Sequence, residues 1–278
     1  MDDCSDQEKD INSSSYHHEW VEAQESLKKK LVLEDDFAWG VPSQGLASGD
    51  DGSRREKLKY IGGVDISFLK KDPLVSCGAL LVLDADTMDV VHEEFEVARL
   101  QVPYVPGFLA FREAPMLLGL LNKMKANAHP FYPQLLMVDG NGLLHPRGLG
   151  LACHLGILAN LPTIGIGKNL HHVDGLTQSA VRQSLEAREN YDKDLIFLTG
   201  KSGKTWGVAM RSSLGSSKPI YVSIANSTGR YKIQDVPSEV QRTVDLGHKL
   251  DTNAVYLSEA SRGQEDLSLK RTFSNLKA

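Results

Sequence analysis

Three carboxylates, on Asp65, Glu113 and Asp139, lie within or at the ends of apolar runs that predict strands and a helix. Asp65 lies in the middle of a strand-like run, on the face opposite to Val64 and Ile66. Asp139 ends an apolar run, a position at which sheets of parallel strands place their ligands. Taken singly, Asp65 also fits an aspartate on a solvated strand face, and Asp139 also fits an aspartate in a turn.

Glu113 is the most informative of the three. It precedes Leu117 by four residues and Leu120 by seven, so a helix would carry all three on one apolar face directed at a sheet. A lone buried carboxylate is costly and is normally protonated or paired. Arg112 and Arg147 are the conventional partners to consider.

Together the three carboxylates predict a divalent-cation site. Converging negative charges repel one another unless a cation lies between them, and hard oxygen ligands select Mg²⁺ or Mn²⁺ over zinc. Such a site activates water for phosphodiester hydrolysis. A phosphate-binding P-loop is not predicted, because Gly165-Ile166-Gly167-Lys168-Asn169 lacks the required spacing. Cys153 and His154 are neighbours on an expected helix and are predicted to be core and surface.

Two further segments carry groups that suit nucleic acid. The rigid turn Pro103-Tyr104-Val105-Pro106-Gly107 presents Tyr104 either as a plate for a base or as a side chain packed in the turn. Lys168 is predicted to offer charge to a phosphate, with a solvated surface charge as the alternative. In the segment after Asp139, backbone N–H groups and two basic side chains are predicted to face phosphate or base. These candidates are Gly140, Gly142, Leu143, His145 and Arg147.

A layered fold is needed to bring these groups together. Strand-like runs at 60–69, 77–84 and 89–100 are separated by short turns and favour an antiparallel meander. Helices at 108–127 and 148–160 then alternate with strands at 135–138 and 163–166, which predicts parallel crossovers. A helix at 178–188 and strands near 196, 206–210 and 220–223 follow. This order predicts an α/β, ribonuclease-H-like mixed sheet flanked by helices.

Bulk composition fits a soluble protein that meets phosphate. Hydrophobic residues make up 41% of the chain, and no apolar run approaches the ~20 residues of a membrane span. Three scattered cysteines predict a reducing compartment. The net charge is −5, but residues 1–51 hold thirteen acids and four bases, so the remaining residues carry +4. A mildly basic body is compatible with phosphate binding.

Several motifs resemble the endonuclease V family, and they cover roughly residues 64–223. They are Val64-Asp65-Ile66-Ser67-Phe68, the block from Pro103 to Glu113, Val138-Asp139-Gly140-Asn141-Gly142, His145-Pro146-Arg147-Gly148-Leu149-Gly150, Ala152-Cys153-His154-Leu155-Gly156 and Gly165-Ile166-Gly167-Lys168. The resemblance implies a nuclease that recognises hypoxanthine and cuts the second phosphodiester bond 3′ to inosine or deoxyinosine. The animal-type branch and inosine in single-stranded RNA are favoured, with DNA as a second substrate.

The resemblance also implies roles for single residues. Asp65, Glu113 and Asp139 match the ligands of Mg²⁺, Tyr104 matches a wedge that fills the space of a flipped base, and Lys168 matches an active-site lysine. We expect a monomer in the cytoplasm and nucleus, including the nucleolus. The expected organisation is an acidic disordered arm at 1–16, a nuclease domain at 17–224 with a mobile loop at 34–56, and a divergent, poorly ordered tail at 225–278. A helix is expected at 17–33.

The match to the family breaks near the end of the last strand. Family members usually continue as Tyr-Val-Ser-x-Gly-His-Arg, with a histidine that reaches toward metal and phosphate. Here Ser223 is followed by Ile224-Ala225-Asn226, which puts Asn226 at the place of that histidine. Asn cannot take a proton at neutral pH. The alternative function is therefore a protein that binds inosine-containing RNA or DNA with weak or absent cleavage.

Overall fold

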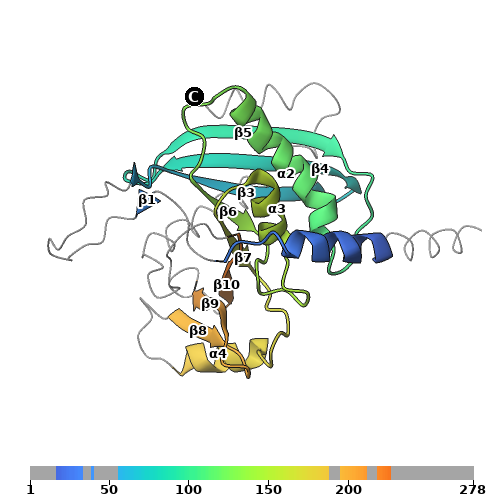
Figure 1. Ribbon diagram of the computed structural model, residues 1–278, viewed down its shortest axis with the longest axis vertical. Coiled ribbons are helices and arrows are strands. Elements are labelled where there is room, and N and C mark those ends of the chain that lie inside the picture. Colours follow the sequence, from blue (N-terminus) through green and yellow to red (C-terminus); the bar gives the residue numbers. More distant parts are fainter. Residues whose placement is uncertain (1–16, 34–38, 41–55, 188–194, 212–217, 227–278) are drawn as a thin grey trace, which may run out of the picture.

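An eight-stranded mixed sheet organises the part of the chain that this computed structural model describes, which is residues 17–33, 39–40, 56–187, 195–211 and 218–226. The predicted acidic arm at 1–16, most of the predicted loop at 34–56 and nearly all of the predicted tail at 225–278 lie outside these residues. The strand order in the sheet is β5-β4-β3-β6-β7-β10-β9-β8 (Figure 1). Two short strands, β1 (Trp39–Gly40) and β2 (Glu56–Lys57), pair separately.

The predicted meander is confirmed. Strands β3 (Tyr60–Leu69), β4 (Asp72–Asp84) and β5 (Val90–Arg99) are antiparallel neighbours. Strand β4 begins earlier than the strand expected from residue 77, because Leu69 pairs with Asp72 and the turn is confined to residues 70–71.

The alternation of helices and strands that follows also agrees with the prediction. Strand β6 (Leu135–Asp139) is parallel to both β3 and β7 (Thr163–Gly167). The helices are α2 (Leu109–Ala126), α3 (Leu151–Ala159) and α4 (Gln178–Glu186). Strands β8 (Leu195–Thr199), β9 (Thr205–Arg211) and β10 (Pro219–Ile224) complete the sheet as antiparallel neighbours. The mixed ribonuclease-H-like sheet expected from the sequence is therefore present.

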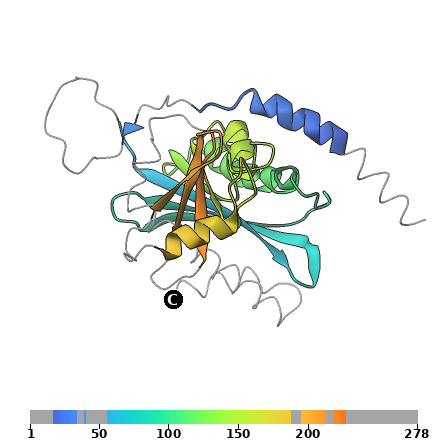
Figure 2. The ribbon, with the colours of Figure 1, turned by 90° about the horizontal axis from the view of Figure 1, so that it is seen from below.

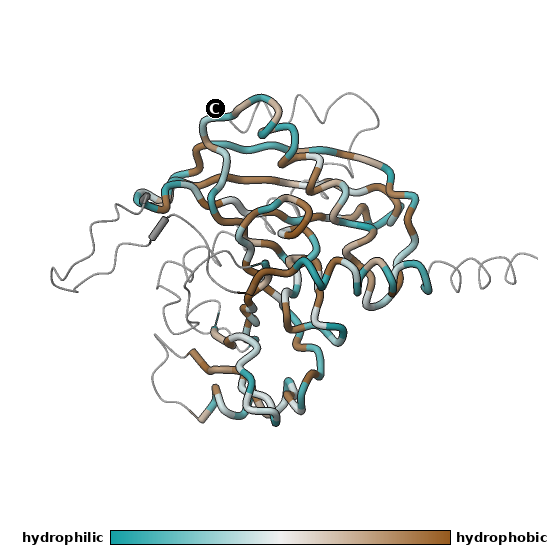
Figure 3. The backbone as a smooth tube through the Cα atoms, in the orientation of Figure 1, coloured by the Kyte–Doolittle hydropathy of each residue, from teal (hydrophilic) through white to brown (hydrophobic). Residues whose placement is uncertain are grey.

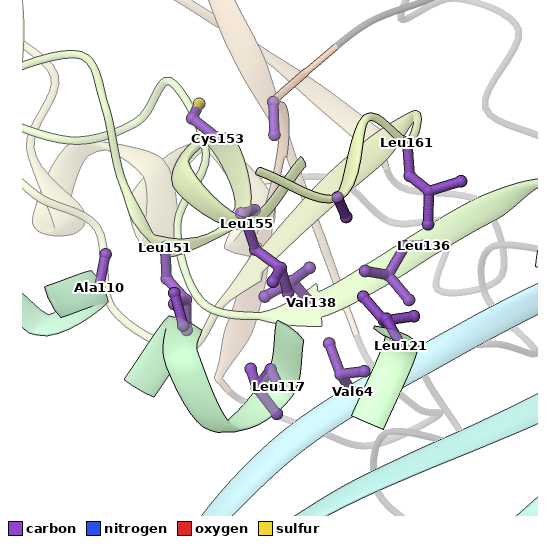
Figure 4. Close-up of a cluster of buried hydrophobic side chains, with 14 of the residues drawn as sticks. Val64, Ala110, Leu117, Leu121, Leu136, Val138, Leu151, Cys153, Leu155 and Leu161 are labelled. Carbon is purple, nitrogen blue, oxygen red and sulfur yellow. The ribbon is translucent and has the colours of Figure 1, made fainter. Parts of the chain in front are cut away.

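The main core lies between the sheet and helices α2 and α3. Leu117 and Leu121 of α2 meet Val64, Leu136 and Val138 of the central strands, and all five are buried (Figure 4). Each such side chain contributes roughly 1.5–3 kcal/mol to the free energy of folding. Figure 3 shows long hydrophobic stretches along the central strands of the sheet, whereas the helices alternate hydrophobic and hydrophilic residues. No helix among the described residues has the length and apolarity to cross a bilayer.

An N-terminal helix over residues 17–28 packs outside this core. It lies on the same side of the sheet as α2 and α3 (Figure 2), and the Trp20 ring stacks on Phe111 of α2 at 5.1 Å. The predicted helix at 17–33 is shorter in the structure, with a turn at residues 29–30. The chain turns there, and the Val32 amide then donates to Asn226 Oδ1.

Candidate active site

The two aspartates come from neighbouring parallel strands. Val64 of β3 pairs with Val138 of β6, so Asp65 and Asp139 lie at the same level of the sheet, where β6 ends. Val64 and Val138 lie in the core under α2, so strand alternation keeps both carboxylates out of that core. Both aspartate side chains are partly exposed. The sheet thus presents two negative charges together at the end of β6.

Glu113 approaches the same region from α2. Only 7% of its surface is exposed, which confirms the burial expected from helical spacing. Burial, together with the negative charges of Asp65 and Asp139, raises the pKa of the Glu113 carboxyl to about 8. The charge of Arg112 opposes this, but its guanidinium donates to the Pro73 carbonyl at 2.6 Å and lies over the Phe68 ring. The Glu113 carboxyl is therefore within electrostatic range of both aspartates.

Lys168 joins this group directly. Its Nζ donates to Asp139 Oδ2 at 2.9 Å, with 53% of the lysine side chain exposed. Lys168 follows β7, which pairs with β6 such that Asp139 lies beside Ile166. The ends of β6 and β7 thus bring the Lys168 ammonium group and the Asp139 carboxylate into contact.

The donor set fits a hard divalent cation. Among the described residues, no group of three or more His, Cys, Asp or Glu side chains has the spacing of a preformed metal site. The three carboxylates influence one another through their charges, and the pKa of Glu113 stays raised because Arg112 does not outweigh burial and the negative charges of the two aspartates. A cation bound by these oxygens would remove that repulsion.

The proline-rich turn before α2 presents its tyrosine outward. Tyr104 is 62% exposed, which agrees with a plate available for a base and not with a tyrosine packed in the turn. Pro103 is exposed beside it. Gly107 closes the turn with a φ of 82°, a conformation that side-chain-bearing residues rarely adopt.

The loop after Asp139 differs from the prediction. Its amides were expected to face phosphate or base, but the Gly140 N–H donates to Ile166 O and the Gly142 N–H to Ser223 Oγ, each at 2.9 Å. The Leu143 N–H donates to Ile224 O. Gly142 permits this close packing, since a Cβ there would lie 2.5 Å from Ile224 O. These three donors are therefore used to hold the loop against the sheet.

The basic side chains of this loop also differ from the prediction that they face substrate. His145 is buried, and burial, together with the charges of His171 and Arg147, lowers its pKa to about 4, so it is neutral at neutral pH. Arg147 contacts the N-terminal helix through Gln24 and Glu25. Neither side chain is a freely solvated surface charge, because His145 is buried and Arg147 contacts the N-terminal helix.

Asn141 is a candidate that sequence reasoning left out. It lies between Asp139 and the glycines that were named, and its Oδ1 is buried without a hydrogen-bond partner among the described residues. Gly167 provides the room, because a Cβ there would lie 2.4 Å from that oxygen. The sequence signal that could have identified Asn141 is its position directly after Asp139-Gly140. His154, expected at the surface, is instead buried edge-on against Phe111.

Comparison with known proteins shows the family of this chain. A family model described as Endonuclease V matches residues 46–246. Endonuclease V of Homo sapiens is 41% identical over 207 residues, which are 74% of this chain and 70% of the human protein. The chain belongs to the endonuclease V family. Endonucleases of this kind are hydrolases that act on phosphodiester bonds. The Mus musculus protein is also 41% identical, and the match spans 58% of its length.

Solved structures of endonuclease V have the same fold. The human enzyme superposes with a TM-score of 0.68 at 32% identity, covering 88% of this chain and 98% of the human one. Endonuclease V of Ciona intestinalis has a TM-score of 0.65 at 28% identity, covering 77% of this chain and 85% of the other. That structure is a complex with a 24mer DNA containing an inosine followed by a ribo-adenosine.

Asn226 does not lie where the family histidine was expected. It is 3% exposed, and its backbone pairs with Thr163 at the start of β7, whereas Asp139 lies beside Ile166 near the end of that strand. Its Nδ2 donates to the carbonyls of Gly156 and Leu161. The expectation that Asn226 stands at the place of a histidine reaching toward metal and phosphate is therefore corrected, because its side chain joins elements of the core.

We accordingly expect Asn226→Ala to destabilise the protein without a matching loss of cleavage by folded molecules. Two buried carbonyls would lose their donor, which costs roughly 2–4 kcal/mol of unfolding free energy. Urea denaturation, with cleavage rates measured well below the melting temperature, checks this. Asn226→His should destabilise as well without raising the rate. A large loss of rate at unchanged stability would place Asn226 in the active site.

Proposed function

We propose that this chain is a metal-dependent endoribonuclease that cleaves the second phosphodiester bond 3′ to inosine in single-stranded RNA. Deoxyinosine in DNA is a second substrate. The observation that carries the proposal is the buried Glu113 carboxyl beside the Asp65 and Asp139 charges. The inosine followed by a ribonucleotide in the Ciona intestinalis complex supports the substrate class.

Each residue has a chemical role in this proposal. Asp65, Glu113 and Asp139 would hold Mg²⁺, with Mn²⁺ as a substitute, and the bound ion supplies activation of water and stabilisation of the leaving oxygen. Lys168, oriented by Asp139, would direct its ammonium group to the scissile phosphate. Its hydrogen bond to Asp139 keeps that charge close to the carboxylates before substrate arrives.

Selectivity for inosine follows from two features. Inosine pairs weakly, so extruding it costs less than extruding an intact purine, and the exposed Tyr104 ring would fill the gap. Hypoxanthine carries an N1–H donor where adenine has an acceptor, so an acceptor placed against N1 of the extruded base would distinguish the two bases. We further propose that the protein acts as a monomer in the cytoplasm and nucleus.

Matched single-stranded oligonucleotides test the function. Purified full-length protein is incubated with Mg²⁺ and RNA carrying one inosine, the same RNA with adenosine, and DNA carrying deoxyinosine, and the cut is mapped. We expect a product one nucleotide beyond inosine in RNA. Tight binding without product would instead support the inosine-binding alternative, and equal cutting of the adenosine control would contradict both.

Tyr104→Ala should weaken inosine cleavage without weakening the fold. The ring is mostly exposed, so the unfolding free energy should change by no more than about 0.5 kcal/mol. Loss of one base stack lowers kcat/KM for inosine RNA by ~10–100-fold. Steady-state cleavage and thermal unfolding measure the two effects, with Tyr104→Phe as the control that keeps the ring. Full activity of the alanine variant would exclude a wedge.

A further inference from the structure

Gln24 of the N-terminal helix is a polar side chain with only 1% of its surface exposed. Its Nε2 donates to the carbonyl of Gly107 at 3.3 Å and to the carbonyl of Leu149 at 3.0 Å. Its Oε1 accepts from Nε of Arg147. One buried amide therefore joins two loops that are distant from each other and from the helix in sequence.

These two loops carry Tyr104, the proposed wedge, and the residues that follow Asp139, a proposed metal ligand. Gly107 closes the turn that presents Tyr104, while Leu149 and Arg147 belong to the loop that begins after Asp139.

Neighbours on the same helix reinforce one side of this bridge. Lys28 Nζ donates to the Arg147 carbonyl at 3.0 Å, and Glu25 lies 3.5 Å from the Arg147 guanidinium. Both contacts hold the second loop only, and both are partly exposed. A residue that only anchored the N-terminal helix to the body would need a hydrogen bond to one loop. The three bonds of Gln24 instead fix the separation of the two loops.

We infer that Gln24 is a positioning residue, which sets the Tyr104 turn relative to the 140–150 loop and thereby the gap that an extruded inosine enters. The inference rests on the proposed function. Removing the amide leaves two carbonyls and a guanidinium without their buried partner, so the loops must shift to find other partners. Gln24 touches neither substrate nor reacting atoms and acts through these loops.

Gln24→Met tests this in the full chain, with Ser26→Met as the matched control at an exposed position of the same helix. We expect kcat/KM for inosine RNA to fall ~10–100-fold for Gln24→Met, as for other small misplacements of a site. In a Tyr104→Ala background the same change should cost less than ~3-fold, because no plate remains to be positioned. An undiminished loss in that background means a purely structural role and overturns the inference.

Hydrogen exchange separates this inference from the proposed function. Amides of the turn, such as Phe108, and of the loop, such as Gly148 and Gly150, should exchange faster together in Gln24→Met and not in Ser26→Met. If only the N-terminal helix loosens, the inference is overturned whatever the protein cuts. If both loops loosen while the wild type leaves inosine RNA intact, the proposed function fails and the coupling through Gln24 stands.

Discussion

Asp65→Ala is expected to lower cleavage of inosine RNA by ~10²–10³-fold while the protein stays folded and still binds RNA. The reason is that catalysis depends on charge placed in advance, and loss of one such group commonly costs ~10²–10³-fold. Asp65 is one of two carboxylates that the sheet holds at the same level, and its charge acts on Glu113. Single-turnover cleavage in Mg²⁺ measures the effect, and binding in Ca²⁺ measures affinity.

Ser67→Ala is the matched control for this variant. Ser67 lies two residues further along β3 on the same strand face, so its loss tests the surface without removing a charge. We expect near-normal turnover for Ser67→Ala. Retained turnover by Asp65→Ala would remove Asp65 from the proposed metal site.

Glu113→Gln is expected to abolish cleavage and yet to stabilise the metal-free protein at alkaline pH. The folded pKa of Glu113 is about 8 against an ordinary 4.5, mainly because of burial. The folded state therefore holds a proton that the unfolded state loses, so stability is complete below pH 4.5 and falls as pH rises toward 8. The expected loss of unfolding free energy over that window is roughly 3–5 kcal/mol.

Urea denaturation at pH 5 and pH 8.5 in a chelator checks this slope. The wild type should lose stability between the two values, and Glu113→Gln should lose much less because the amide does not titrate. Glu186→Gln, at an exposed position of α4, should behave like the wild type. Parallel slopes for wild type and Glu113→Gln would contradict the buried-carboxylate interpretation.

Divalent cations extend the same experiment. Mg²⁺ that binds only the folded state stabilises it by mass action. We expect Mg²⁺ to raise the melting temperature of the wild type at pH 8 and to have little effect on Glu113→Gln. Equal stabilisation of both proteins would place the ion elsewhere.

Local periodicity was enough to find most of the framework. Residues 60–69 were expected as a strand and form β3 with the same bounds. Glu113 was expected on the buried face of its helix and is 7% exposed. Both predictions follow from the spacing of apolar residues within a short segment. A repeat of two residues determines the apolar face of a strand, and a repeat of about 3.6 residues determines that of a helix.

The sequence by itself therefore determined that Asp65 and Asp139 lie on strands and that Glu113 lies on the buried face of a helix. Tertiary structure alone decided the hydrogen-bond partners: Gly142 with Ser223, 81 residues away, and Arg147 with Gln24, 123 residues away. It also moved Asn226 from the expected active site to the core, where Val32, 194 residues away, donates to its side chain. Polar groups must be satisfied when they are buried, but their partners depend on which distant segments meet, and local spacing carries no record of that.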